Sequence, residues 1–357
     1  MNTVTANTVG ILTPIWEHIL RRSPIGPEEN FFDLGGNAVL ALQLSEAIAK
    51  VCGQDMPAEA ISRAPTIAAL AAVIEQPTLP RFSTLVPLKP GSKEPPVFLV
   101  HGLDGALMKL GRMARLLSTA HSIVGIQAPG LDGRPPLDRV EDMAELYVKA
   151  IRERQSAGPY FLIGYSLGGM IAFEIARRLA VGGEQIALLA MLDAYPHLRQ
   201  LSPSQRVRVV FQRAIRHLVE MSHMSPRTAF SYVWQRVRKR LGLSKGNAEP
   251  GRQEARPSSA ELVRSVYEKG AAALARYQPT GVYPGAVKFV RSESTSWFPK
   301  DPTPVWEKFV QRFECESVPG DHLSMLSDHF EAAAALLSRY IDEASAQAPQ
   351  ITSPQPK

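Results

Sequence analysis

The sequence predicts an all-α domain followed by a larger α/β domain built on a mostly parallel sheet. Apolar residues recur at helical spacing through the first 76 residues, whereas short apolar runs alternate with amphipathic stretches in the rest of the chain. A proline-rich connector, 77–96, separates the two patterns. The chain has 357 residues, 45% of them apolar, which is enough to fill two separate cores.

Three segments carry the helical pattern of the first domain. They are 9–22, 38–51 and 66–76, and the loops between them are rich in Pro, Gly and Asn. We therefore place the first domain at 8–78 and a linker at 79–95.

The second domain, at 96–342, repeats a strand-then-helix order. Its strands are predicted from nearly continuous apolar runs, which are typical of buried parallel strands: 96–102, 122–130, 160–166, 186–193, 286–293 and 313–320. Amphipathic helices are expected between the earlier strands, at 108–117, 140–155 and 167–179. This alternation predicts helices on both faces of the sheet.

An insertion interrupts this order after the fourth strand. Residues 196–258 contain two helix-like stretches, 203–222 and 226–242, and an insertion at this place is where a lid would sit. The last residues, 343–357, are polar and proline-rich, and we expect them to form a disordered tail.

The stretch "FLIGYSLGGMIAFEIARRLA" places Gly-x-Ser-x-Gly between a strand and a helix. In this context the motif is a nucleophile elbow, whose glycines make room for a sharp turn that raises the serine hydroxyl above the sheet. It predicts Ser166 as a nucleophile. Together with the strand order, it predicts an α/β-hydrolase fold with a helical lid.

A serine hydroxyl is a weak nucleophile at neutral pH, so it needs a base and an acid that orients the base. In this fold both follow the serine along the chain. Asp193 ends the next predicted strand, and His322 lies in the loop after the last strand, a position that no other histidine shares. We expect Ser166, Asp193 and His322 to act together, and Asp321 to stabilise its own loop.

The negative charge that develops on an attacked carbonyl needs hydrogen-bond donors aimed at it. One is the backbone N–H of Leu167, which follows the nucleophile and begins a helix. The second is expected in the loop "VHGLDGA" after the first strand, and we assign it to the N–H of Leu103.

Residues 31–44, "FFDLGGNAVLALQL", resemble the attachment motif of peptidyl carrier proteins from nonribosomal peptide synthetases. In that motif, D-x-G-G-x-S presents a serine for a phosphopantetheine arm. The resemblance implies a four-helix carrier domain with 4′-phosphopantetheine as its cofactor. Ala38 stands at the serine position and has no hydroxyl to accept the arm. We expect Ala38 to be an introduced substitution, and a naturally silent carrier is the alternative.

Residues 97–338 resemble the type I thioesterase domain that ends such assembly lines. "HGLDG", "GYSLGG", "LLAMLD" and "GDHLSML" match its oxyanion, elbow, acid and base motifs in order. The resemblance implies that the chain releases a carrier-bound acyl or peptidyl chain through an acyl-enzyme at Ser166. Water, an amine or a hydroxyl would then resolve that intermediate. Upstream condensation and adenylation domains are the implied partners, and a phosphopantetheinyl transferase is the partner of the serine form.

Three alternatives stay open at this point. A stand-alone serine esterase or lipase with an accessory helical domain would cleave small oxygen esters without a carrier. A docking module with an inert hydrolase fold would not react with a serine-directed reagent. A polyketide-type carrier–thioesterase is a closer variant, against which the double glycine before Asn37 argues only modestly.

Charge and composition limit the kinds of partner that the chain can have. The net charge of +6 comes largely from basic residues in the predicted lid, and no nucleic-acid motif accompanies them. Because the carrier segment is acidic, Arg236, Arg238 and Arg240 could receive it. No secretory signal, membrane span or metal-ligand spacing is evident, and Cys52 and Cys315 lie far apart. We expect a cytoplasmic protein without a metal.

Overall fold

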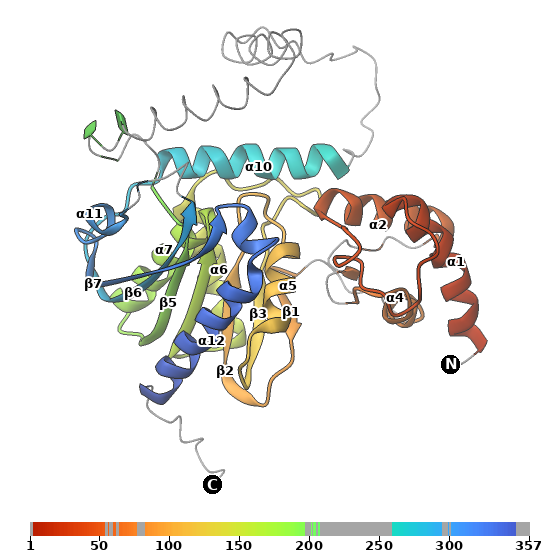
Figure 1. The fold of residues 1–357 in the computed structure, drawn as a ribbon, viewed down its shortest axis with the longest axis horizontal. Helices are drawn as coiled ribbons and strands as arrows, with labels where there is room; N and C mark the ends of the chain where they lie inside the picture. The colour runs from red at the N-terminus through yellow and green to blue at the C-terminus, as the bar shows by residue number, and fades with distance from the viewer. Residues whose placement is uncertain are drawn as a thin grey trace, which may run out of the picture.

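The computed structural model shows a small helical domain beside a larger α/β domain (Figure 1). The structure describes residues 3–53, 56, 60–61, 64–76, 83–196, 201, 203–204, 206–207, 259–294, 299 and 301–347. Most of the predicted lid lies outside these ranges. Its second helix-like stretch, 226–242, is not described, and only 203–204 and 206–207 of the first, 203–222, are. Within the described ranges, no helix is both long and apolar enough to cross a membrane.

The helical domain contains α1 (Thr3–Leu20), α2 (Ala38–Cys52) and α4 (Ile67–Ile74), as the apolar spacing predicts. Their apolar faces meet in one core, in which Trp16 contacts Phe31 edge to face. Residues 60–61 are helical between α2 and α4, but most of their neighbours are not described, so the fourth helix is not traced.

The double-glycine turn before α2 has a steric cause. Gly35 has a φ of 95°, and a Cβ on Gly36 would lie 2.2 Å from the Phe31 ring. Asn37 then caps the helix, because its side chain accepts hydrogen bonds from the N–H groups of Val39 and Leu40. The turn is therefore rigid where α2 begins.

The α/β domain contains a seven-stranded sheet in the order β1-β3-β2-β4-β5-β6-β7. All pairs are parallel except β1 with β3. The strands are β1 (Leu85–Lys89), β2 (Lys93–Val100), β3 (His121–Ile126), β4 (Tyr160–Tyr165), β5 (Ile186–Leu192), β6 (Tyr283–Ser294) and β7 (Val310–Asp321). The mostly parallel sheet predicted from the sequence is confirmed.

Helices cover both faces of this sheet. One face packs against α6 (Val140–Arg154) and α7 (Leu167–Val181), and the other against α5 (Met108–Leu116) and α12 (Phe330–Gln347). Phe98 and Val100 of β2 point to the first core, whereas Val97 and Leu99 point to the second. Burial on both sides explains why the strands are nearly continuous apolar runs.

Three short or crossing elements complete the domain. They are α10 (Ser259–Arg276), α11 (Thr303–Trp306) and the 3₁₀ turn η2 (Ser324–Leu326). Figure 1 shows α10 lying across the end of the sheet where the parallel strands finish and reaching toward α2, with which it is in contact.

The observed elements differ from two predicted boundaries. Strand β1 and the start of β2 fall inside the expected linker, 79–95. Strand β1 can contain Pro87 because it lies at the edge of the sheet, where the missing N–H of a proline is tolerated. Helix α12 continues to Gln347, beyond the expected start of the tail at 343, because Ala344 still packs into the core.

Candidate active site

Ser166 lies at the turn between β4 and α7, at the end of the sheet where the parallel strands finish. Its φ of 57° and ψ of −119° place it in a region that non-glycine residues rarely adopt. Such a conformation costs about 1–3 kcal/mol and persists only where the surroundings enforce it. The sharp, strained turn predicted from Gly-x-Ser-x-Gly is present.

The two motif glycines are required because backbone packs against backbone at this turn. A Cβ on Gly164 would lie 2.1 Å from the carbonyl oxygen of Gly168. A Cβ on Gly168 would lie 2.2 Å from the carbonyl oxygen of His101, the residue that directly follows β2. The elbow is thus held directly against the loop that contains Leu103.

His322 follows β7 and turns toward the serine. Its Nε2 lies 3.1 Å from the Oγ of Ser166, and its Nδ1 lies 3.3 Å from Oδ2 of Asp193. The three groups come from β4–α7, β5 and β7, and they are 156 and 129 positions apart in the chain. The structure brings the predicted serine, acid and base together in the order that proton transfer from the serine requires.

Asp193 is held in a fixed orientation. It is buried and has a positive φ of 44°, just after β5. Its carboxylate accepts hydrogen bonds from the N–H of Ser292, at 2.8 Å, and from the Oγ–H of the same residue, at 2.6 Å. Ser292 lies on the adjacent strand β6, so sheet pairing aims this carboxylate at His322.

Tyr165, the residue before the nucleophile, supports His322 from the other side. The two rings are stacked, with centroids 5.0 Å apart and planes inclined by 22°. The Tyr165 hydroxyl donates a hydrogen bond of 2.5 Å to the His322 carbonyl oxygen. Burial raises the pKa of this phenol above its usual value, so it stays a donor. Sequence reasoning did not identify Tyr165 or Ser292.

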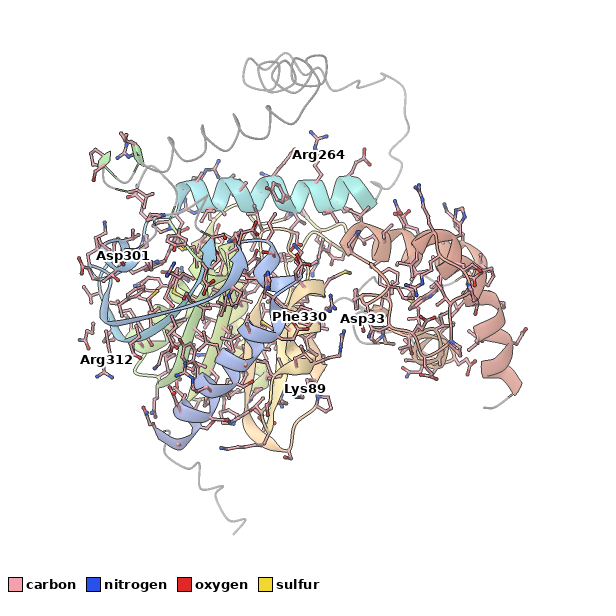
Figure 2. All side chains as sticks on the ribbon, in the orientation of Figure 1. Asp33, Lys89, Arg264, Asp301, Arg312 and Phe330 are labelled. Atoms are coloured by element: carbon pink, nitrogen blue, oxygen red, sulfur yellow. The ribbon has the colours of Figure 1, made fainter. Side chains whose placement is uncertain are left out.

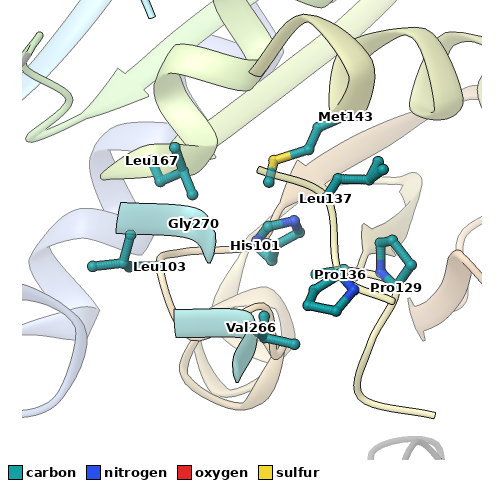
Figure 3. Close-up of a pocket in the computed structure, with 10 residues that line it drawn as sticks. His101, Leu103, Pro129, Pro136, Leu137, Met143, Leu167, Val266 and Gly270 are labelled. Atoms are coloured by element: carbon teal, nitrogen blue, oxygen red, sulfur yellow. The ribbon is translucent and has the colours of Figure 1, made fainter. Parts of the chain in front are cut away.

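The predicted oxyanion donors belong to two adjacent backbone segments. Leu167 is the first residue of α7, and Leu103 lies in the loop after β2. Figure 3 shows their side chains beside Gly270 of α10, at one end of a small and mainly apolar cavity of about 10 Å³. This volume holds about one water molecule. The oxyanion role of the N–H groups of Leu103 and Leu167 stays a prediction.

His101 is a structural residue. It is fully buried, and its Nδ1–H donates to the Gly102 carbonyl oxygen at 2.6 Å while Nε2 accepts from the Tyr147 hydroxyl at 2.6 Å. Burial lowers the pKa of its imidazole from 6.5 to about 4, so the ring is neutral at pH 7. It therefore anchors the backbone that leads to Leu103.

Other residues considered from the sequence have different surroundings. Asp321 accepts hydrogen bonds from the N–H groups of Leu323 and Ser324, which stabilises the loop as expected. Ala38 is the first residue of α2. The basic residues Arg236, Arg238 and Arg240 lie outside the described ranges, and their contact with the carrier stays a prediction. No cluster of His, Cys, Asp or Glu that could hold a metal occurs among the described residues.

Known protein families match both parts of the chain. The model for the thioesterase domain matches residues 95–341, well over half of the sequence. The chain belongs to the thioesterase family. A model for the phosphopantetheine attachment site matches residues 11–74, in front of this thioesterase domain. The chain is therefore a carrier–thioesterase didomain with an α/β-hydrolase fold.

The thioesterase is similar to parts of longer proteins. It is 36% identical over 189 residues to a dimodular nonribosomal peptide synthase of Bacillus subtilis (strain 168), a match that covers 52% of this chain and 8% of that protein. A solved four-domain nonribosomal peptide synthetase bound to AMP and glycine matches 96% of this chain and 26% of its own, with 25% identity and a TM-score of 0.54. The type II thioesterase BorB shares the fold at 18% identity, covering 72% of this chain and 97% of its own, with a TM-score of 0.50. The chain thus spans a small part of the synthetases that it matches.

Proposed function

We propose that this thioesterase releases an acyl or peptidyl chain from a nonribosomal peptide synthetase by cleaving the thioester that joins it to a pantetheine thiol. One observation carries the proposal. Ser166 Oγ, His322 and Asp193 form a continuous chain of contacts of 3.1 and 3.3 Å, in a protein that pairs a carrier domain with a thioesterase domain.

In the first step, Nε2 of His322 takes the proton of the Ser166 hydroxyl while the oxygen attacks the thioester carbonyl. The N–H groups of Leu103 and Leu167 stabilise the oxyanion that forms. His322 then gives its proton to the departing thiolate, and the acyl group stays on Ser166. Asp193 accepts the Nδ1–H of His322, which fixes the imidazole tautomer and stabilises its charged form.

In the second step, a nucleophile resolves the acyl-enzyme. His322 takes a proton from water, or from an amine or hydroxyl, and returns it to the Ser166 oxygen as the ester breaks. Water gives a free acid, whereas an internal amine or hydroxyl gives a ring.

The carrier domain lacks the hydroxyl group to which its phosphopantetheine cofactor would be attached. A phosphopantetheine arm is joined through a hydroxyl oxygen, and Ala38 has only a methyl group. We propose that the serine form of this carrier, loaded by a phosphopantetheinyl transferase, presents the substrate. Upstream condensation and adenylation domains in the cytoplasm would supply the chain.

Synthetic acyl- and peptidyl-pantetheine thioesters test this function directly. We expect thiol release by the wild-type chain and a loss of at least about a thousandfold in Ser166→Ala. Mass spectrometry of the products separates hydrolysis from cyclisation. A fluorophosphonate should label Ser166 in the wild type and leave the alanine variant unlabelled. Absence of labelling would favour an inert docking module.

An oxygen ester of the same acyl group is the matched substrate for the esterase alternative. A carrier-dependent thioesterase should cleave the thioester faster than the ester, whereas a general esterase should cleave small esters equally well. Faster cleavage of the oxygen ester would overturn the proposal.

A further inference from the structure

Helix α5 presents one side to the sheet and another to the helical domain. Leu110, Met113 and Ala114 are buried in the core of the α/β domain. Met108, Arg112 and Arg115 are spaced by four and three positions, so they share a different face of the helix. All three contact the carrier domain.

Asp33 of the attachment turn lies between the two arginines. Its Oδ1 is 3.5 Å from Nε of Arg112 and 3.5 Å from Nη2 of Arg115. Figure 2 labels Asp33 on the side of the helical domain that faces the sheet, near Phe330. The three side chains are each between a third and just over half exposed. Exposed pairs of this kind are weak, which suits a contact that must form and release.

The turn and the arginines are both held in place. The N–H groups of residues 34–36 donate to the carbonyl oxygens of residues 30–32, which fixes Asp33 relative to the start of α2. The guanidinium of Arg112 lies 4.0 Å from the centre of the Phe330 ring, at the start of α12. Arg112 thus contacts Phe330 of the thioesterase domain and Asp33 of the carrier domain at the same time.

An apolar contact accompanies the charges. Met108 packs against the core cluster of the carrier domain. Met108, the first residue of α5, follows Leu103 by five residues. In the loop between them, the N–H of Gly105 donates to the Gly102 carbonyl oxygen, and the Gly105 carbonyl oxygen accepts from the N–H of Ala128. A short, hydrogen-bonded segment thus joins the carrier contact to the oxyanion loop.

Helix α10 contacts both the carrier domain and the residues of the predicted oxyanion site. It contacts α2 in the carrier domain, and a Cβ on its Gly270 would lie 3.2 Å from the carbonyl oxygen of Leu103 and 3.1 Å from a methyl group of Leu167. Residue 38 begins α2, so a group attached there starts on a helix that α10 contacts, and Figure 1 shows α10 running from α2 across the α/β domain.

We propose that the α5 face formed by Met108, Arg112 and Arg115 is the surface on which the thioesterase domain receives its carrier, and that the two arginines recognise the carrier through Asp33. The occupant is the N-terminal domain of the same chain. Delivery of substrate across this contact rests on the proposed function, whereas the contact itself does not.

The contact is tested first on the chain as it exists. Arg112→Glu/Arg115→Glu should increase the radius of gyration in small-angle X-ray scattering, and adding Asp33→Arg should restore the wild-type value. Arg152→Glu/Arg154→Glu is the matched control, since these arginines pair with Glu184 and Glu94 elsewhere. An unchanged radius in the α5 double variant would overturn the proposal.

Delivery is tested in the Ala38→Ser background after complete loading with an acyl-pantetheine arm. Single-turnover release in the α5 double variant should fall about tenfold, with rescue by Asp33→Arg, while cleavage of a soluble thioester stays at the wild-type rate. Equal loss on both substrates, or no rescue, would overturn direct recognition of Asp33. If the wild type itself leaves the soluble thioester intact, the proposed function fails, and scattering still decides the contact.

Discussion

At the scale of single residues, two side chains hold the imidazole and the carboxylate of the site. Tyr165 stacks on His322 and binds its carbonyl oxygen, and Ser292 donates twice to Asp193. Without these two side chains, the 3.1 and 3.3 Å contacts of His322 would depend only on the backbone positions of His322 and Asp193. Both are therefore positioning residues for the proposed reaction.

Tyr165→Phe separates the two contributions of this residue, because it keeps the stacked ring and removes the hydroxyl. We expect kcat for a soluble thioester to fall by roughly three- to tenfold with little change in KM, since one hydrogen bond contributes about 1 kcal/mol. Tyr165→Leu, which also removes the ring, should lose more. Steady-state kinetics check this, and equal kcat values for wild type and Tyr165→Phe would rule out the role.

His101 should make stability depend on pH. Its native pKa is lowered from 6.5 to about 4 by burial, so the unfolded chain binds one proton more than the native chain between these values. The free energy of unfolding should therefore fall by about 3 kcal/mol as the pH drops from 6.5 to 4. Urea unfolding at several pH values measures it, with His101→Asn as the variant that lacks this contribution. Parallel pH profiles for both chains would contradict the assignment.

The sequence allowed some site residues to be predicted and not others. Ser166 was identifiable from a local motif, and Asp193 and His322 from chain order. Ser292 was not, because it is 99 positions from Asp193 and meets it only through the pairing of β5 with β6. Tyr165 was missed although it adjoins the serine, because its partner His322 is 157 positions away.

At the scale of elements, the strands and the helices between them followed from periodicity, whereas their ends did not. Pro87 made strand β1 resemble a linker, and the polar residues after 343 hid the last turn of α12, which Ala344 anchors. The elbow is the element on which the site depends most, because backbone atoms of α7 and of the segment after β2 touch there.

Gly168→Ala should separate these two segments. Its Cβ would lie 2.2 Å from the His101 carbonyl oxygen, so the elbow must move away from the Leu103 loop and the two N–H groups diverge. We expect kcat/KM for a soluble thioester to fall by about a hundredfold or more. Gly111→Ala is the control, since its Cβ meets only a Leu88 methyl group at 3.8 Å. Similar activity in both variants, measured after circular dichroism confirms folding, would refute this account.

At the scale of the whole molecule, the carrier and thioesterase domains meet through α5 and α10, and α10 also contacts Leu103 and Leu167. The didomain organisation was predictable from two motifs in tandem order. The contact between the domains was not, because Asp33 and Arg115 are 82 positions apart and neither charge is distinctive in the sequence.

Restoring the hydroxyl at position 38 should restore loading. We expect Ala38→Ser to gain the mass of one phosphopantetheine arm when incubated with a phosphopantetheinyl transferase and coenzyme A, because the Gly35–Gly36 turn and the Asn37 cap are already formed. The unsubstituted chain is the control and should gain nothing. A serine variant that stays unmodified in intact-protein mass spectra would mark this domain as a silent carrier.

Hybrid synthetases would meet a constraint at Met108. A foreign carrier grafted in front of this thioesterase keeps an acid at position 33, because that acid belongs to the attachment motif, and so keeps both arginine partners. The apolar surface that Met108 touches varies with the graft, and it is joined to the catalytic loop by only five residues. Matching the carrier to that one side chain is therefore the first adjustment that such a graft requires.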